Sequence, residues 1–237
     1  IPVGGFPYPP ATWTWISIWF PTVGLCLGAM QAVLWAALAS PTNPWLQVVA
    51  VIVAVAAGML VTGGFHEDGL ADSFDALGGG YDKASVLRIL KDSRIGTFGT
   101  LAVLITVGLR IALLCALGPH APLGFLLGQS VSRATPVVLL AVLPYARRDD
   151  AASRSRDVAR SGGVQAILAA VSAGLFLAML SPSLATGTAI VLGAAGVTAI
   201  WGAYVYRRVG GLTGDFLGAA QQLAELCILG ALVVFDG

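Results

Sequence analysis

The chain has 237 residues, of which 57% are hydrophobic and 11% are charged, with a net charge of +1. Soluble domains carry about 25% charged residues, so the composition excludes an ordinary soluble fold and favours a chain that lies in a bilayer. The net charge gives no indication of a nucleic-acid partner, and we expect none. Because the sequence opens at Ile1 rather than Met, we expect native residues to precede it.

Seven stretches are long and apolar enough to cross a bilayer, for which a helix needs about 20 mostly apolar residues. In chain order they are residues 18–39, 45–63, 100–118, 123–143, 164–181, 186–205 and 216–235. The fifth and sixth are rich in alanine and glycine, so six spans remain an alternative. We predict an all-α polytopic membrane helix bundle that forms a single integral membrane domain over residues 1–237, with polar helices in the 64–99 connection.

Lysine and arginine gather in three connections of this arrangement. Of the 13 in the chain, four lie in 64–99, five in 144–163 and two in 206–215. With seven spans these connections share one side of the membrane, and the three opposite connections hold no lysine or arginine. The positive-inside rule makes the charged side cytoplasmic, with the N-terminus inside and the C-terminus outside.

Two arginines fall inside apolar spans, where an ionised side chain normally faces the bundle interior or a water-filled cavity. Arg133 lies in a polar segment with a helix-distorting Pro136, and anion binding is favoured over a structural pair with an acid. For Arg110 two roles stay open: it could bind an anion, or it could hold a carboxylate or a carbonyl of its own bundle. Glu225 in the last span needs a partner, for which Arg110 or Arg133 are candidates. Glycines four residues apart are interpreted as helix-packing sites: Gly24 with Gly28, and Gly214 with Gly218.

The 64–99 connection opens with an acidic stretch, residues 66–75. Asp68, Asp72 and Asp75 stand at i, i+4 and i+7, positions that share one helix face. Like charges on one face repel, and a divalent cation relieves the repulsion; Mg²⁺ prefers carboxylate oxygens and bridges to phosphates. A solvated acidic surface is the alternative. The predicted metal ligands are Asp68, Asp72, Asp75, Asp92, Asp215 and Glu67.

Phosphate-binding groups follow the acidic stretch. Lys91 and Arg94 flank Asp92 among hydroxyls and glycines, which is the donor chemistry that phosphate oxygens require. His66 is interpreted as a substrate contact or proton carrier, with a structural hydrogen bond as the alternative, because Mg²⁺ sites rarely use imidazole. Asp215 opens the last span, where helix capping is its alternative role.

This set of groups suits displacement at a phosphorus centre, in which metal neutralises a diphosphate and a carboxylate accepts a hydroxyl proton. The predicted catalytic residues are Asp68, Asp72, Asp75, His66 and Asp92. The opposing hypothesis is a membrane transporter, for example of a divalent cation, motivated by the embedded Arg110, Arg133 and Glu225. Against it, the acids lie at the cytoplasmic edge, whereas transporter sites usually lie near the midplane between repeats.

Three motifs resemble the cobalamin synthase family (adenosylcobinamide-GDP ribazoletransferase) in order and spacing. They are the segments 63–75 (GGFHEDGLADSFD), 91–99 (KDSRIGTFG) and 210–219 (GGLTGDFLGA). The opening Ile1-Pro2-Val3, Ser132-Arg133 and Tyr145-Ala146-Arg147 extend the likeness through nearly the whole chain. The family tolerates an apolar residue at position 67, so Glu67 ranks below the other ligands.

The resemblance implies an inner-membrane enzyme of the last steps of vitamin B12 assembly. It would join adenosylcobinamide-GDP to α-ribazole or its 5′-phosphate, release GMP and require Mg²⁺, with the active site on the cytoplasmic side of the lipid bilayer. A homo-oligomer or an association with other corrinoid-pathway enzymes is a further expectation. Under the transporter hypothesis, the resemblance adds a corrinoid to the divalent cation as a candidate cargo. The residues expected to bind substrate or phosphate are Lys91, Arg94, Arg133, Arg147, Gly211, Thr213 and Gly214.

Overall fold

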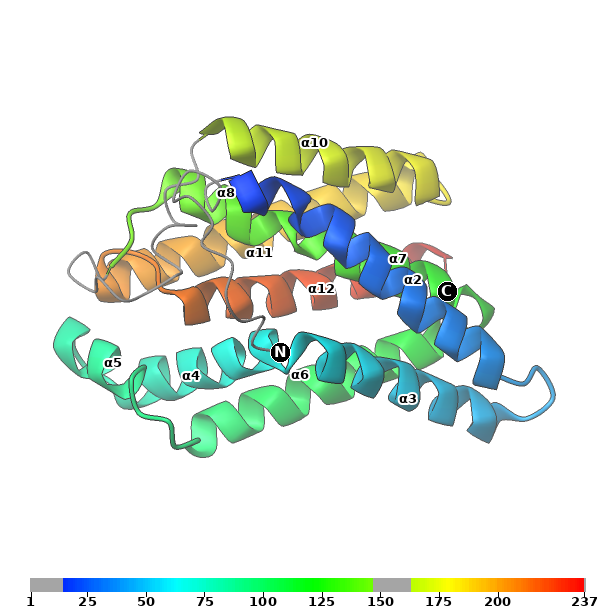
Figure 1. Ribbon diagram of the computed structural model, residues 1–237, viewed down its shortest axis with the longest axis horizontal. Helices are drawn as coiled ribbons and strands as arrows, with labels where there is room; N and C mark the ends of the chain where they lie inside the picture. Colours follow the sequence, from blue (N-terminus) through cyan, green and yellow to red (C-terminus); the bar gives the residue numbers. More distant parts are fainter. Residues whose placement is uncertain (1–14, 147–162, 237) are drawn as a thin grey trace, which may run out of the picture.

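The structure, a computed structural model, describes residues 15–146 and 163–236, and these fold into a bundle of helices (Figure 1). In chain order the helices are η1 (Ser17–Trp19), α2 (Phe20–Leu38), α3 (Pro44–Thr62), α4 (Phe65–Gly79), α5 (Lys83–Ile89), α6 (Thr97–Ala116), η2 (Gly118–His120), α7 (Ala121–Ser132), α8 (Ala134–Val142), α10 (Gly163–Leu180), α11 (Leu184–Val209) and α12 (Gly214–Asp236). The described residues form no strand beyond two isolated bridges, so the all-α prediction is confirmed.

Seven helical segments in the described residues are long and apolar enough to cross a membrane, which confirms the preferred span count. They cover Ser17–Leu38, Pro44–Thr62, Thr97–Ala116, Gly118–Val142, Gly163–Leu180, Leu184–Val209 and Gly214–Phe235. Leu60, Met179 and Leu184 are each at least 81% exposed, which suits contact with lipid. The protein is therefore a multi-pass membrane protein.

The fourth span is broken at Arg133, which ends α7 and precedes α8. Pro136 has no backbone N–H to give to the Ser132 carbonyl, so the regular helical bond is missing there. The Thr135 hydroxyl donates to that carbonyl instead, at 2.7 Å. The polar segment predicted around Arg133 is thus a helix break inside the bundle, and it turns the Arg133 side chain into the interior, where it is 6% exposed.

Glycines let α2 pack closely against α7. A Cβ added at Gly24 or Gly28 would collide with the backbone oxygens of Gln129 and Phe125 respectively. The packing interpretation of this glycine pair is confirmed, and the close contact brings α2 beside the break at Arg133.

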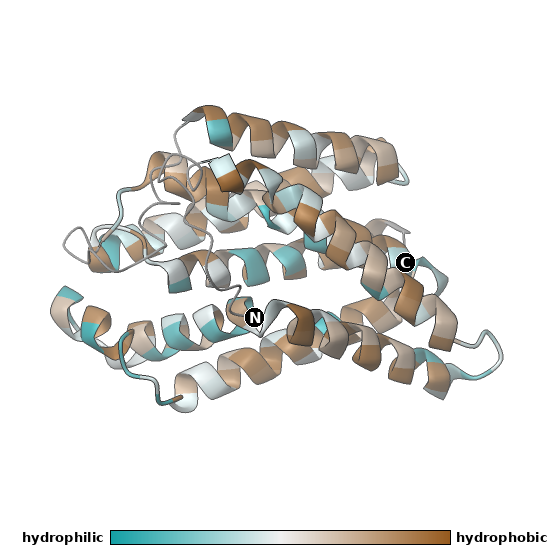
Figure 2. Ribbon diagram, viewed as in Figure 1, coloured by the Kyte–Doolittle hydropathy of each residue, from teal (hydrophilic) through white to brown (hydrophobic). Residues whose placement is uncertain are grey.

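The polar helix α4 packs into the bundle rather than lying apart from it. Gly63 and Gly64, with φ of 68° and 66°, end α3 in the left-handed region and redirect the chain. From there α4 runs beside α12 and α6 (Figure 1). It buries its small and apolar face, which includes Leu70, Ala71 and Ala76. Figure 2 shows the resulting polar residues along α4 and α12 inside an otherwise apolar bundle.

Candidate functional site

The carboxylates of the predicted metal site lie on two helices that meet at glycines. A Cβ at Gly69 of α4 would come within 2.9 Å of the Asp215 backbone oxygen and 3.3 Å of the Gly218 Cα. Asp72 follows Gly69 by three residues, so it lies on the side of α4 that faces Asp215. Asp68, one turn earlier, is exposed, and in the described part of the chain its carboxylate has no hydrogen-bond partner. The α4–α12 crossing therefore gathers acidic residues from two segments that are far apart in sequence.

Asp75 has a different environment from Asp68 and Asp72, although all three share α4 as predicted. One of its carboxylate oxygens accepts the Gly96 N–H at 2.6 Å and the other accepts the Gly99 N–H at 2.8 Å. These are N–H groups of the first turn of α6, so Asp75 caps that helix across the loop. A Cβ at Gly96 would lie 2.5 Å from an Asp75 oxygen, so the glycine permits this contact. The carboxylate of Asp75 is therefore engaged in holding the start of α6 in position.

Glu67 is buried and paired with Arg110, which fits its lower rank as a metal ligand. Arg110 Nη1 donates to Glu67 Oε1 at 3.1 Å, and its Nη2 donates to Gln222 Oε1. Arg110 Nε also lies 3.3 Å from Glu225 Oε1. The predicted pairing of Glu225 with an embedded arginine is confirmed for Arg110. One arginine thereby joins α4, α6 and α12.

The network continues through glutamines to Arg133. Gln129 Nε2 donates to Glu225 Oε1 at 2.7 Å, and Gln221 Nε2 donates to Glu225 Oε2 at 3.0 Å. Arg133 Nη1 donates to the Gln129 backbone oxygen at 2.7 Å and to its Oε1 at 2.5 Å. Two arginines and two glutamates thus balance each other in the bundle interior, which is how buried charges are normally tolerated.

The predicted phosphate-binding cations Lys91 and Arg94 lie on the exposed loop between α5 and α6. Arg94 Nε and Nη2 donate to the two carboxylate oxygens of Asp92 at 3.0 and 2.7 Å. The Arg94 hydrogen bonds lower the pKa of Asp92 to about 2. Asp92 therefore stays ionised within its own loop, and the structure does not join it to the carboxylates of the α4–α12 crossing.

The loop before α12 holds the remaining predicted contacts. Leu212 N–H donates to the Pro144 oxygen at 2.8 Å, and a Cβ at Gly211 would lie 2.5 Å from that oxygen, so close backbone packing accounts for Gly211. Thr213 is fully buried, and its hydroxyl lies 3.2 Å from Asp215 Oδ2. Gly214 begins α12 and lines a cavity. The predicted contact Arg147 lies outside the described residues.

Arg208 ties this end of the bundle to α4. The structure extends α11 four residues beyond the predicted span, to Val209, so that Arg208 lies in its last turn. Its Nη2 donates to the Gly80 oxygen at 2.5 Å and the Leu77 oxygen at 3.2 Å. These carbonyls lie at the C-terminal end of α4, where a cation is favoured. The acidic helix is thus held at both ends.

His66 lies at the start of α4 and makes no hydrogen bond within the described residues, so the structural alternative finds no support there. Burial, then Arg133 and Arg110, lower the pKa of His66 to about 3. The imidazole is therefore neutral near pH 7. It is a weak base, suited to a hydrogen-bonding contact more than to taking up a proton.

The chemistry of the donors tests whether a metal ion fits. Among the described residues, no group of three or more His, Cys, Asp or Glu side chains forms a metal-binding cluster. Mg²⁺, however, usually takes one or two carboxylates and completes its shell with substrate phosphates and water. Asp72 and Asp215, with Asp68 one turn away, match that requirement in donor type. Mg²⁺ at this crossing stays a prediction.

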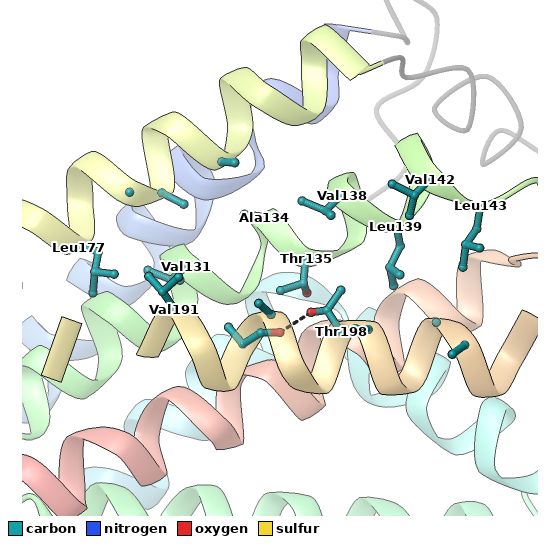
Figure 3. A pocket seen from close by; sticks show the side chains of 18 residues that line it. Val131, Ala134, Thr135, Val138, Leu139, Val142, Leu143, Leu177, Val191 and Thr198 are labelled. Atoms are coloured by element: carbon teal, nitrogen blue, oxygen red, sulfur yellow. Dashed lines mark hydrogen bonds between the residues drawn. The ribbon is translucent and has the colours of Figure 1, made fainter. Parts of the chain in front are cut away.

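Among the cavities of the described bundle, two are large enough to hold a small molecule. One of about 500 Å³ lies against α8, α10 and α11 (Figure 3). It has no titratable residue in its lining, and the Thr198 hydroxyl donates to the Ala194 oxygen of its own helix. The other, of about 630 Å³, includes His66, Arg133, Gly214 and Gly218 in its lining. Of these two, the second is lined by residues close in sequence to the predicted carboxylates, since His66 precedes Asp68 by two residues and Gly214 precedes Asp215.

Sequence reasoning missed the glutamines of the buried network and the cavity. Gln129 precedes Arg133 by four residues, and Gln221 precedes Glu225 by four. Polar residues spaced by one helical turn from an embedded charge were the available signal. The cavity had no such signal, because most of its lining is apolar and comes from segments distant in sequence.

Comparisons with known proteins identify relatives of the whole chain. The family model described as cobalamin-5-phosphate synthase matches residues 1–233. A relative from Shewanella baltica, named adenosylcobinamide-GDP ribazoletransferase, is 36% identical over 225 residues, covering 92% of this chain and 83% of its own length. A relative of the same name from Shewanella woodyi is 37% identical over 240 residues, covering 94% and 90%. No solved structure gives a significant match.

Proposed function

Because the chain belongs to the cobalamin-5-phosphate synthase family, we propose that it joins adenosylcobinamide-GDP to α-ribazole, or to α-ribazole 5′-phosphate, and releases GMP. The names of its relatives support the substrates and the reaction. The observation that supports this site is the close contact of α4 and α12 at Gly69, which brings the Asp215 backbone against the helix that carries Asp68 and Asp72.

The proposed reaction is a displacement at phosphorus. A ribose hydroxyl oxygen of the acceptor attacks the phosphorus that bears the cobinamide alcohol, and the bond from that phosphorus to the GMP oxygen breaks. The hydroxyl proton goes to a carboxylate, for which Asp68 is suited because it is exposed and has no hydrogen-bond partner in the described part of the chain. Arg133 adds positive charge at the edge of the cavity, where phosphate oxygens would lie.

Mg²⁺ is part of the proposal. Asp72 and Asp215 would hold it, with Asp68 close by, and when bound it would neutralise diphosphate charge. Asp75 caps α6 and Glu67 pairs with Arg110, so we assign these two to positioning α4.

We place the active site on the cytoplasmic side of the inner membrane. The charged connections 64–99, 144–163 and 206–215 share one side of a seven-span bundle, and the positive-inside rule makes that side cytoplasmic. The residues that suggested a transporter, Arg110, Arg133 and Glu225, take part in one charge-balanced network with Glu67. They therefore require no transported ion to neutralise them.

The test measures GMP release by the protein purified in detergent, with and without Mg²⁺. Asp68→Asn and Asp72→Asn should each lower the rate by about 10²-fold or more, the range for removal of a proton-accepting or charge-stabilising group. Asp82→Asn is the matched control, because Asp82 caps the short exposed helix α5 and asparagine caps equally well. Full activity in both site variants, or in the presence of a chelator, would disprove the respective assignment.

A further inference from the structure

The 630 Å³ cavity lies where four parts of the bundle meet: α2, the α3–α4 junction, the α7–α8 break and the start of α12. Its walls are mostly apolar and include Phe20, Leu27, Phe65, Pro136, Leu140 and Leu217. Pockets of 300–1,000 Å³ with apolar walls and a few polar groups are typical of small-molecule sites. The volume therefore suits a nucleoside and is far too small for a corrin macrocycle.

Polar groups are concentrated at one part of this cavity. Arg133 uses only Nη1 for its hydrogen bonds within the described residues, both to Gln129, which leaves Nε and Nη2 to a ligand. Its side chain is buried, and the salt-bridged network behind it holds it in place. His66 also lines the cavity, and its ring nitrogens can hydrogen-bond to a ligand.

The cavity is also lined by residues next to the predicted carboxylates in sequence. Gly214 and Gly218, which flank Asp215 on α12, line it, and so does His66, two residues before Asp68. A ligand in the cavity would thus have one end against apolar side chains of α2 and α8. Its other end would reach the α4–α12 crossing.

Among the parts of the proposed substrates, one matches this environment. Guanine has several hydrogen-bonding edges, and an apolar wall would leave them unpaired at a cost of about 1–3 kcal/mol each. The base of α-ribazole is a dimethylated benzimidazole, an apolar bicyclic ring with one free ring nitrogen. Its ribose carries the hydroxyls and the optional 5′-phosphate, which match His66 and Arg133.

We propose that this cavity binds the acceptor nucleoside, with its aromatic base among the apolar residues of α2 and α8 and its ribose at the α4–α12 crossing. The assignment rests on the proposed function for the identity of the acceptor. It divides the substrates between two sides of the carboxylates: the acceptor on the apolar side, and the corrinoid and nucleotide outside the cavity.

Cys26 offers a direct probe, because it lines the cavity and its side chain is exposed. In a Cys115→Ala/Cys227→Ala background, labelling of Cys26 by an apolar maleimide should slow about tenfold when α-ribazole is present at ten times its Kd. The matched control is Cys26→Ala/Val33→Cys in the same background. Val33 is on the same helix, is 70% exposed and does not line the cavity, so its labelling should not change. If the background fails to fold, the wild-type protein is labelled and Cys26 is quantified by mass spectrometry.

Failure of the cavity assignment and failure of the proposed transfer give different results. GMP release with no protection of Cys26 by α-ribazole overturns the cavity assignment, as does equal protection of both cysteines or protection by adenosylcobinamide-GDP alone. Labelling that responds only to the acyl-chain length of the detergent assigns the cavity to lipid and also overturns it. Protection of Cys26 in a protein that releases no GMP sustains the cavity and overturns the transfer.

Steady-state kinetics give a second readout. Cys26→Trp narrows the cavity and should raise the KM for α-ribazole about tenfold, while the KM for adenosylcobinamide-GDP stays the same. Val33→Trp adds the same bulk outside the cavity and should change neither value. An equal rise in both KM values for Cys26→Trp would show a general structural effect and would contradict the assignment.

Discussion

Replacing Arg110 with methionine tests the buried network most severely. Arg110 contacts Glu67 and Glu225, and all three side chains are at most 9% exposed. Removing one partner of a buried ion pair typically costs about 3–5 kcal/mol, because the other charge stays buried without compensation. Methionine fills a similar volume, so the loss reflects charge and hydrogen bonding more than a cavity. For a chain of this size that loss lowers the unfolding midpoint by roughly 6–20 °C.

The assay is thermal unfolding in detergent, with Arg88→Met as control, because Arg88 lies exposed on α5 and the same substitution there should cost under about 0.5 kcal/mol. Adding Glu225→Gln to Arg110→Met should restore part of the midpoint, since it removes one uncompensated carboxylate. A shift for Arg110→Met no larger than that of Arg88→Met would refute the reasoning. So would a double variant less stable than the single one.

Three further predictions concern single residues. Asp75→Asn should cost about 1–2 kcal/mol of stability, because its amide cannot accept both N–H groups at the start of α6, and activity that falls with unchanged stability would instead make Asp75 catalytic. Gly211→Ala should cost about 1–3 kcal/mol by clashing with the Pro144 oxygen, whereas Gly230→Ala, with open space around it, should be neutral or stabilising; equal thermal midpoints for the two would contradict this. Because the folded pKa of His66 is lowered to about 3 from 6.5, its stabilising contribution is present above pH 6.5 and is lost as the pH falls toward 3, by at most ~1.4 kcal/mol per unit. His66→Gln should flatten the decline of the midpoint over that window, and an unchanged pH profile would contradict the lowered pKa.

The spans could be predicted because hydropathy is a local property of the sequence. The seven predicted ranges agree with the helices to within a few residues at most ends. The exceptions have identifiable physical causes. Helix α11 continues to Val209, where Arg208 binds the carbonyls at the end of α4, a contact distant in sequence. The fourth span breaks at Arg133, one turn before Pro136, because the proline cannot donate to the Ser132 carbonyl.

The site was predictable only in part. Helical spacing correctly placed Asp68, Asp72 and Asp75 on one helix, but it could not distinguish a carboxylate that faces a neighbouring helix from one that caps it. That difference depends on where α6 begins in space. The same limit applies to Gly211, whose closeness to Pro144 arises from a loop more than 60 residues earlier in the chain.

The contact between α4 and α12 also has a consequence for biosynthesis. Residues 65–79 leave the ribosome early, whereas their main partner, residues 214–236, is translated last among the described helices. Until α12 has been inserted, Glu67 lacks Gln222, Arg110 lacks Glu225, and the crossing at Gly69 does not exist. The nascent chain therefore carries incompletely paired charge in its interior until the last described helix has been inserted.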